Sequence, residues 1–317
     1  MSKIIGIDIS KQTFDVSFKE NQKWNHYVFK NQEKGFHQLL KIINENDWIV
    51  MEASGSYYFP LAIFLSKRNL KVCVENPLII KRFSQTMLYR AKTDKKDAQT
   101  IAEYGEKYEL KQWKQESENC TKIRHIHTRV EMLSKQIHQT KRQLEAFKSS
   151  GALDNFLEKS LEKDLSDLKK SKEKLEKEMQ KLAEKEYGNT MEKLESIPGI
   201  GKKTAMMLSL ITDNFKKFEN YKQLIAYVGF SPRVYQSGTS VKGKGHICKM
   251  GKSQIRKLLY MCSWAAKHCN IACVEMYNRL KSIGKPERVI KIAIANKLLK
   301  QAFAIAKSNN IYQENYC

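Results

Sequence analysis

Four acidic residues in the first third of the chain have the residue type and spacing for metal-assisted chemistry. Asp8 and Glu52 each stand near the end of a short apolar run, and Asp94 and Asp97 are three residues apart. Four converging carboxylates would repel one another without a cation, and oxygen-only ligands suit magnesium or manganese. Two such ions can activate a nucleophile and stabilise a leaving oxygen in phosphodiester chemistry. Taken singly, these acids could instead be surface residues or partners of a helix N-terminus.

The segments that would position these acids form an α/β pattern. Short β-branched runs predict strands at 3–9, 13–18, 24–29, 48–51 and 70–74. Helical spacing predicts helices at 33–45, 57–67 and 78–88, with another beginning near Thr93. Three strands followed by alternating helices and strands predict a domain with a mixed sheet, here assigned to residues 1–120. Asp8 and Glu52 then lie at strand ends, where the ligands of α/β sheets gather.

The middle of the chain, residues 121–187, repeats apolar residues at near-heptad spacing with Lys and Glu between them. Ser149-Ser150-Gly151 separates two such stripes, which predicts an antiparallel helical hairpin or coiled coil. Its expected roles are spacing and dimerisation, and a hairpin that contacts nothing else is the alternative. After Tyr187-Gly188-Asn189 the pattern predicts a third, mostly helical domain at 188–317.

The charge of the chain is concentrated in this last domain. The 317 residues carry a formal net charge of +23, and residues 188–317 contribute 22 basic against 7 acidic residues. A folded basic segment favours a polyanionic partner, most often nucleic acid. No apolar run reaches the length of a membrane helix and no signal peptide is evident at the N-terminus, so no membrane partner is expected.

Seven cysteines, an odd number, are scattered along the chain, which argues against a disulfide scaffold and favours a reducing cytoplasm. Cys262, Cys269 and Cys273 have spacings of seven and four, which predicts one face of a single helix. They lack paired C-x-x-C spacing and are interpreted as core residues and not as a zinc site.

Residues 197–205, Ile-Pro-Gly-Ile-Gly-Lys-Lys-Thr-Ala, have the form of a helix-hairpin-helix turn. Gly199 and Gly201 would permit close backbone approach, and the N–H groups of the next helix would receive a phosphate without contacting bases. Lys202 and Lys203 add charge. A plain connection between two helices is the alternative.

Three segments resemble the signature blocks of a known family: Ile-Gly-Ile-Asp-Ile-Ser-Lys at 5–11, Met-Glu-Ala-Ser-Gly-Ser-Tyr at 51–57 and Lys-Thr-Asp-Lys-Lys-Asp-Ala at 92–98. They look like the DEDD transposases of insertion-sequence family 110, also called bridge recombinases. The resemblance implies an RNase H-like (RuvC-like) N-terminal domain in which Asp8, Glu52, Asp94 and Asp97 are the metal ligands. The third block is quite specific, whereas Gly-Ile-Asp-Ile alone would be weak.

Residues from about 190 to 275 look like the second block of the same family, the transposase-20 type domain. There a Ser before Gly, followed by a basic loop, serves as nucleophile, and Ser237 matches that position in a predicted flexible loop. Ser231 and Ser240 do not match. Basic residues around this serine are candidates to bind nucleic acid: Arg233, Lys242, Lys244, Lys249, Lys252 and Arg256.

The resemblance implies a transposase that cuts and rejoins DNA to mobilise its own insertion sequence. It further implies a structured guide RNA, a dimer-to-tetramer assembly with active sites shared between subunits, and a place at the bacterial nucleoid. Three rivals remain: a RuvC-like junction nuclease that uses water, an actin-like sugar kinase, and a non-catalytic DNA-binding adaptor. The kinase is disfavoured because no second Gly-rich phosphate loop is found and because the net charge is +23.

Overall fold

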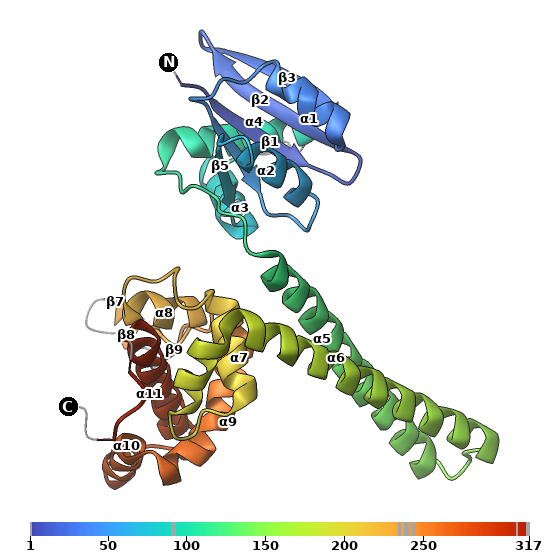
Figure 1. Cartoon of the computed structure of the whole chain (residues 1–317), viewed down its shortest axis with the longest axis vertical. Coiled ribbons are helices and arrows are strands. Elements are labelled where there is room, and N and C mark those ends of the chain that lie inside the picture. Colours follow the sequence, from blue (N-terminus) through green and yellow to red (C-terminus); the bar gives the residue numbers. More distant parts are fainter. Residues whose placement is uncertain are drawn as a thin grey trace. The chain divides into compact units, whose positions relative to one another are not determined.

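The computed structural model describes residues 2–89, 93–233, 236–237, 241–242, 245–308 and 310–314. Its contacts divide the chain into two units, Met1–Glu116 and Ser117–Cys317, and each is described by itself (Figure 1). The predicted division into three domains at 120 and 187 stays a prediction. None of the described helices is long and apolar enough to cross a membrane.

A mixed sheet of five strands forms the centre of the first unit, in the order β3-β2-β1-β4-β5. The strands are β1 (Ile4–Ile9), β2 (Thr13–Glu20), β3 (Lys23–Lys30), β4 (Trp48–Glu52) and β5 (Lys71–Glu75). The β1–β2 and β2–β3 pairs are antiparallel, whereas β1–β4 and β4–β5 are parallel. The mixed sheet predicted from three strands followed by alternating elements is therefore confirmed.

Helices cover both faces of this sheet. They are α1 (Glu33–Leu40), α2 (Phe59–Ser66), α3 (Pro77–Thr86) and α4 (Asp94–Lys107). Because side chains alternate along a strand, Ile5 and Ile7 of β1 enter a core with α1 and α2, whereas Gly6 meets α4 on the opposite face. The second face has its own small core, to which α3 and α4 contribute Phe83 and Ile101. The acidic residue Asp8 shares the face of Gly6.

Two long helices, α5 (Glu118–Ser149) and α6 (Asn155–Glu195), form an antiparallel hairpin in the second unit (Figure 1). Glu186 near the end of α6 accepts hydrogen bonds from Ser117 and Asn119 at the start of α5, at 2.7 and 3.1 Å. At the other end of the hairpin, Lys148 forms an ion pair with Glu158 at 2.6 Å. These contacts tie both ends of the predicted hairpin.

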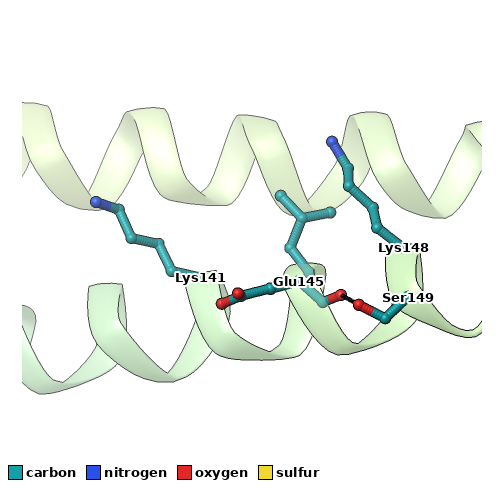
Figure 2. A pocket seen from close by; sticks show the side chains of 5 residues that line it. Lys141, Glu145, Lys148 and Ser149 are labelled. Atoms are coloured by element: carbon teal, nitrogen blue, oxygen red, sulfur yellow. Dashed lines mark hydrogen bonds between the residues drawn. The ribbon is translucent and has the colours of Figure 1, made fainter.

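Figure 2 shows the hollow at that far end, where Lys141 and Lys148 extend from α5 toward α6. Leu144, Glu145 and Ser149 complete its lining. Lys148 is held by Glu158 and, at 3.7 Å, by Glu162, and the Ser149 hydroxyl donates to the backbone of Glu145. Lys148 therefore pairs the two helices, whereas Ser149 is engaged within α5.

The rest of the second unit, where the structure describes it, is helical with four two-residue strands. The helices are α7 (Lys202–Thr212), α8 (Tyr221–Val228), α9 (Ser253–Cys269), α10 (Ile271–Ser282) and α11 (Glu287–Lys307). The strands are β6 (Pro232–Arg233), β7 (Gln236–Ser237), β8 (Val241–Lys242) and β9 (His246–Ile247), paired β6–β9 and β7–β8. One core joins these helices to the last turns of α6.

Two expectations from the sequence are wrong at the level of helices. Helix α6 continues through Gly188, where the pattern predicted a break, because Tyr187 and Met191 stay buried on the same face. Cys273 does not share a helix with Cys262 and Cys269, since α9 ends at Cys269. Asn270 begins a new helix there, accepting from the backbone N–H of Cys273.

Candidate active site

Asp8 and Glu52 lie at the carboxyl ends of adjacent parallel strands. The register pairs Ile7 of β1 with Met51 of β4, and the two acids are the next residues of each strand. Both side chains are partly buried. Matched positions of parallel strands direct their side chains to the same face, so these two carboxylates face the same layer of helices. The sheet thus brings together two acids that are 44 residues apart in sequence.

Helix α4 supplies the other two acids from its first turn. Thr93 caps this helix, its side chain accepting from the backbone N–H of Lys96 at 3.2 Å, and Asp94 and Asp97 follow. Gly6 determines how closely the helix approaches β1. A Cβ atom at residue 6 would lie 2.1 Å from the carbonyl oxygen of Ala98. The absence of a side chain at residue 6 therefore lets the acidic end of α4 pack beside Asp8.

Electrostatics connects all four acids. The pKa of Asp8 is raised from 3.8 to about 6, first by burial and then by the charges of Asp97, Asp94 and Glu52, with a smaller effect from Asp15. Nearby negative charges disfavour the ionised form of a carboxyl, so these acids lie close enough to Asp8 to act on it. The structure thus places the other three sequence-predicted acids within electrostatic reach of Asp8.

The donor set fits a divalent cation in its chemistry. Its ligands would all be carboxylate oxygens, which suit magnesium or manganese, and a cation would offset the like charges that raise the pKa of Asp8. Within the described ranges, no three His, Cys, Asp or Glu side chains already stand at metal-binding distances. The other three acids therefore lie near enough to Asp8 to affect its pKa, but the four side chains are not arranged at metal-ligand distances.

Two further acidic groups on this face were missed by sequence reasoning. Glu75 ends β5, in register with Glu52, and its carboxylate accepts from the Tyr104 hydroxyl at 2.9 Å. Asp15 of β2 lies opposite Asp8, is buried, and contacts the Nε2 atom of His26 at 2.8 Å. Glu75 could have been found as the acid that ends the third parallel strand. The pairing of Asp15 with His26 depends on strand register, which the sequence pattern leaves open.

The glycine-rich turn between α6 and α7 gives its two glycines different roles. Gly199 has a φ of +98°, and a Cβ there would lie 2.7 Å from the Cβ of Ala266 on α9, so this glycine is required for packing. Gly201 forms the N-cap of α7, and nothing lies within 4 Å of its Cβ position. The predicted close approach of a phosphate therefore has open space at Gly201 only.

Lys202 and Lys203 begin α7, and both are exposed yet paired with acids of α6. Lys202 lies 2.7 Å from Glu184, and Lys203 lies 3.1 Å from Glu176. A phosphate at the start of α7 would have to share these lysines with the two glutamates. Their predicted contribution to nucleic-acid binding is thereby reduced, because part of their charge is already balanced.

The other basic candidates follow α8. Arg233 lies in β6 opposite His246, and Lys249 and Lys252 are exposed just before α9. Arg256 instead donates to the backbone carbonyl of Val228 at 2.6 Å and is partly buried, which gives it a role in the fold. Lys244 lies outside the described residues.

The backbone of Ser237 lies in strand β7, opposite Val241 of β8. The sequence predicted a flexible loop here; the structure places the serine backbone in a two-residue ladder, and Gly238 lies outside the described residues. Lys242 lies in the partner strand, opposite Gln236.

Comparison with known proteins gives a consistent class. A transposase model with a DEDD domain matches residues 5–148, which include all four acids, and a transposase model of the IS116/IS110/IS902 family matches residues 191–278. Pilin gene-inverting proteins of Moraxella lacunata and Moraxella bovis are 29% identical to the chain, over 99% of both lengths. An insertion element IS110 protein of Streptomyces coelicolor is 26% identical over 38% of this chain and 29% of its own.

The acidic sheet edge and these matches define an enzyme that acts on DNA, a transposase. Two transposase models match the chain, one over the first unit and α5 and the other from the end of α6 onward. The chain therefore belongs to the IS110 family of transposases.

Proposed function

We propose that this chain cuts and rejoins DNA strands through a magnesium or manganese site at Asp8, Glu52, Asp94 and Asp97, in an RNase H-like domain. The observation that carries the proposal is geometric: Asp8 and Glu52 end adjacent parallel strands in register, and Asp94 and Asp97 lie in the first turn of α4, which packs closely on β1 at Gly6. The bound metal would supply a Lewis acid for phosphoryl chemistry. The four carboxylates, at the carboxyl ends of two strands and in the first turn of α4, would hold that metal.

Ser237 is the proposed nucleophile of the reaction. Its Oγ forms a bond to the DNA phosphorus while the bond from phosphorus to the 3′ oxygen breaks; the serine proton passes to solvent and the 3′ oxygen takes up a proton. The number of phosphate ester bonds is unchanged, so a free 3′ hydroxyl can later attack the phosphoserine and rejoin the strand without ATP. Support comes from the match of residues 191–278 to the family's second transposase model.

The basic part of the second unit is the proposed DNA-binding surface. Lys242 lies in the β7–β8 ladder with Ser237, Arg233 lies in the β6–β9 ladder, and Lys249 and Lys252 lie between β9 and α9. Phosphate contacts of this kind position a duplex without reading its sequence. Sequence choice then requires another element, and the family resemblance supplies the proposal of a structured guide RNA and of a dimer or tetramer that shares its active sites.

The name of the Moraxella relatives adds DNA inversion to the expected products of the reaction. They are called pilin gene-inverting proteins, and inversion of a DNA segment uses the same cutting and rejoining as movement of an element. The proposal therefore commits to strand exchange through a phosphoserine, and the DNA arrangement decides between inversion and transposition.

Cleavage of element-end DNA tests this mechanism. Purified protein is incubated with magnesium and with or without RNA transcribed from the element's non-coding end, and products are run on denaturing gels before and after protease. We expect a protease-sensitive protein–DNA adduct that Ser237→Ala and Asp8→Ala both abolish and that Ser231→Ala, a nearby serine outside the family position, retains. Cleavage by Ser237→Ala without any adduct would replace the serine mechanism with a water-using nuclease. An adduct formed equally well without RNA would remove the guide from the proposal.

A further inference from the structure

Helix α9 presents two large apolar side chains to solvent, one turn apart. Met261 is 64% exposed and Trp264 is 50% exposed, whereas Ile255, Leu259 and Ala266 on the other side of the helix are buried. Lys257 and His268 are also exposed and fall in the same helical stripe, at spacings of four, three and four residues. This stripe, Lys257-Met261-Trp264-His268, is called the α9 stripe.

The indole of Trp264 is fixed from one side. The ammonium of Lys291 on α11 lies 3.4 Å from the centre of the ring, and the side chain of Lys291 is only 7% exposed. Glu287 holds that ammonium at 3.3 Å and also pairs with Lys267 at 3.2 Å. A cation seated against one face of an indole stabilises the ring in place. Trp264 therefore presents a flat apolar ring that is fixed in position and half exposed to solvent.

The surroundings of the α9 stripe are strongly basic. Residues 253–314 contain eleven Lys or Arg and three Glu, and one of the three, Glu287, is already paired with Lys267 and Lys291. Arg288, beside Glu287, is exposed. A ligand that fits this surface must carry negative charge. It must also carry a flat apolar group that can stack on the indole. A nucleobase on a phosphate backbone has both properties.

We propose that the α9 stripe binds an unpaired segment of a DNA strand, with one base stacked on the open face of Trp264. The phosphates on either side of that base would lie near Lys257 and Arg288. This inference rests on the proposed function, because strand exchange is what separates DNA strands. Paired bases already stack on their neighbours, so the site favours single-stranded DNA over duplex.

Tryptophan fluorescence of the full chain tests the proposal directly. The other three tryptophans, Trp24, Trp48 and Trp113, all belong to the first unit, so Trp264 alone reports on the second. A fifteen-nucleotide oligothymidylate should quench part of the emission, and Trp264→Phe should remove that part while keeping most of the affinity. Trp264→Ala should weaken binding about fivefold to a hundredfold, the range for loss of one stacked base. Trp24→Phe is the matched control and should keep the quenching.

Several results would overturn the proposal. These are quenching by duplex alone, stronger quenching by oligouridylate than by oligothymidylate, or equal affinity in wild type and Trp264→Ala. Self-association that disappears in Trp264→Ala would assign the stripe to a second copy of the chain. If Trp264→Ala does not fold, wild-type quenching and its loss in Trp264→Phe decide the matter. Ser237→Ala should still show the quenching, so failure of the serine mechanism and failure of the stacking site give different results.

Discussion

Ionisation of Asp8 is opposed by burial and by the charges of Asp97, Asp94 and Glu52, which raise its pKa from 3.8 to about 6. Between these two values the folded protein keeps a proton that the unfolded chain has lost. The stability of the metal-free protein therefore falls as the pH rises through this window, and the full cost is present above it. Allowing for solvent screening, that cost is about 1–2 kcal/mol.

Asp8→Asn removes this charge while keeping the shape of the side chain. In EDTA we expect the variant to be more stable than wild type by about 1–2 kcal/mol at pH 7.5 and equal to it near pH 4. Urea unfolding at several pH values measures the difference. Glu45→Gln, at an exposed position outside the site, is the control and should change little at any pH. A gain for Asp8→Asn that is the same at all pH values would contradict the charge cluster.

Single residues differ in how far the sequence reveals them. Asp8 and Glu52 were predicted as acids at strand ends, and the structure places both there. Asp94 and Asp97 were predicted as an acidic pair at the start of a helix, but their distance from Asp8 depends on how α4 packs, which the sequence pattern leaves open. Asp15 escaped notice, since a buried acid paired with His26 looks like any polar residue of an alternating strand.

At the scale of elements, the contact between α4 and β1 depends on Gly6. A Cβ at this position would lie 2.1 Å from the carbonyl oxygen of Ala98 and 2.3 Å from the backbone nitrogen of Ala102, and backbone atoms cannot rotate away. We expect Gly6→Ala to lower the stability of the first unit by about 1–3 kcal/mol or more. It should also abolish DNA cleavage, because the acids of α4 move away from Asp8.

Tryptophan fluorescence during urea unfolding measures this change, since three of the four tryptophans lie in the first unit. Gly188→Ala, inside α6 with nothing within 4 Å of the Cβ position, is the control. It should keep cleavage activity and raise helix stability by about 0.5–1 kcal/mol. A Gly6→Ala protein with wild-type stability and cleavage would show that α4 can pack farther from β1 without loss of function.

The two glycines before α7 separate folding from binding. Gly199→Ala should destabilise the second unit by about 1–3 kcal/mol, because φ is +98° and the Cβ of Ala266 lies in the way. Gly201→Ala should leave stability within about 0.5 kcal/mol and should weaken duplex binding, since the added methyl occupies the space open to a phosphate. Thermal unfolding and gel-shift titration measure the two effects. Unchanged binding by a folded Gly201→Ala protein would remove this turn from the DNA surface.

Helices and strands with a strong repeating pattern were predictable, whereas their ends were less so. The break between α5 and α6 was read from Ser149-Ser150-Gly151, and the structure has its turn there. The continuation of α6 through Gly188 was not, because a helix tolerates one glycine when buried neighbours such as Tyr187 compensate. The junction of α9 and α10 depends on the side chain of Asn270, which a pattern of apolar residues does not register.

At the scale of the whole molecule, charge predicts the partner and also its salt dependence. The net charge is +23, and the described basic residues of the second unit include exposed ones such as Lys249. Each phosphate neutralised by a protein cation releases counterions, so the logarithm of affinity falls linearly with the logarithm of salt, with a slope of about −0.9 for each contact. With about six to ten contacts, duplex affinity should fall by a factor on the order of 10³–10⁵ between 50 and 200 mM salt.

The change in this slope in a variant shows whether the substituted lysine contacts a phosphate. Lys249→Gln should reduce the magnitude of the slope by about one and weaken binding about equally for all sequences, as expected for a phosphate contact. Lys122→Gln is the matched control, since it removes the same single charge from α5, outside residues 188–317, where this lysine is paired with Glu118 at 2.7 Å. Fluorescence anisotropy of a labelled duplex at four salt concentrations measures both slopes. If Lys122→Gln lowered the slope as much as Lys249→Gln, the duplex would extend along the helical hairpin, and the charge surplus of the last 130 residues would not mark the DNA surface.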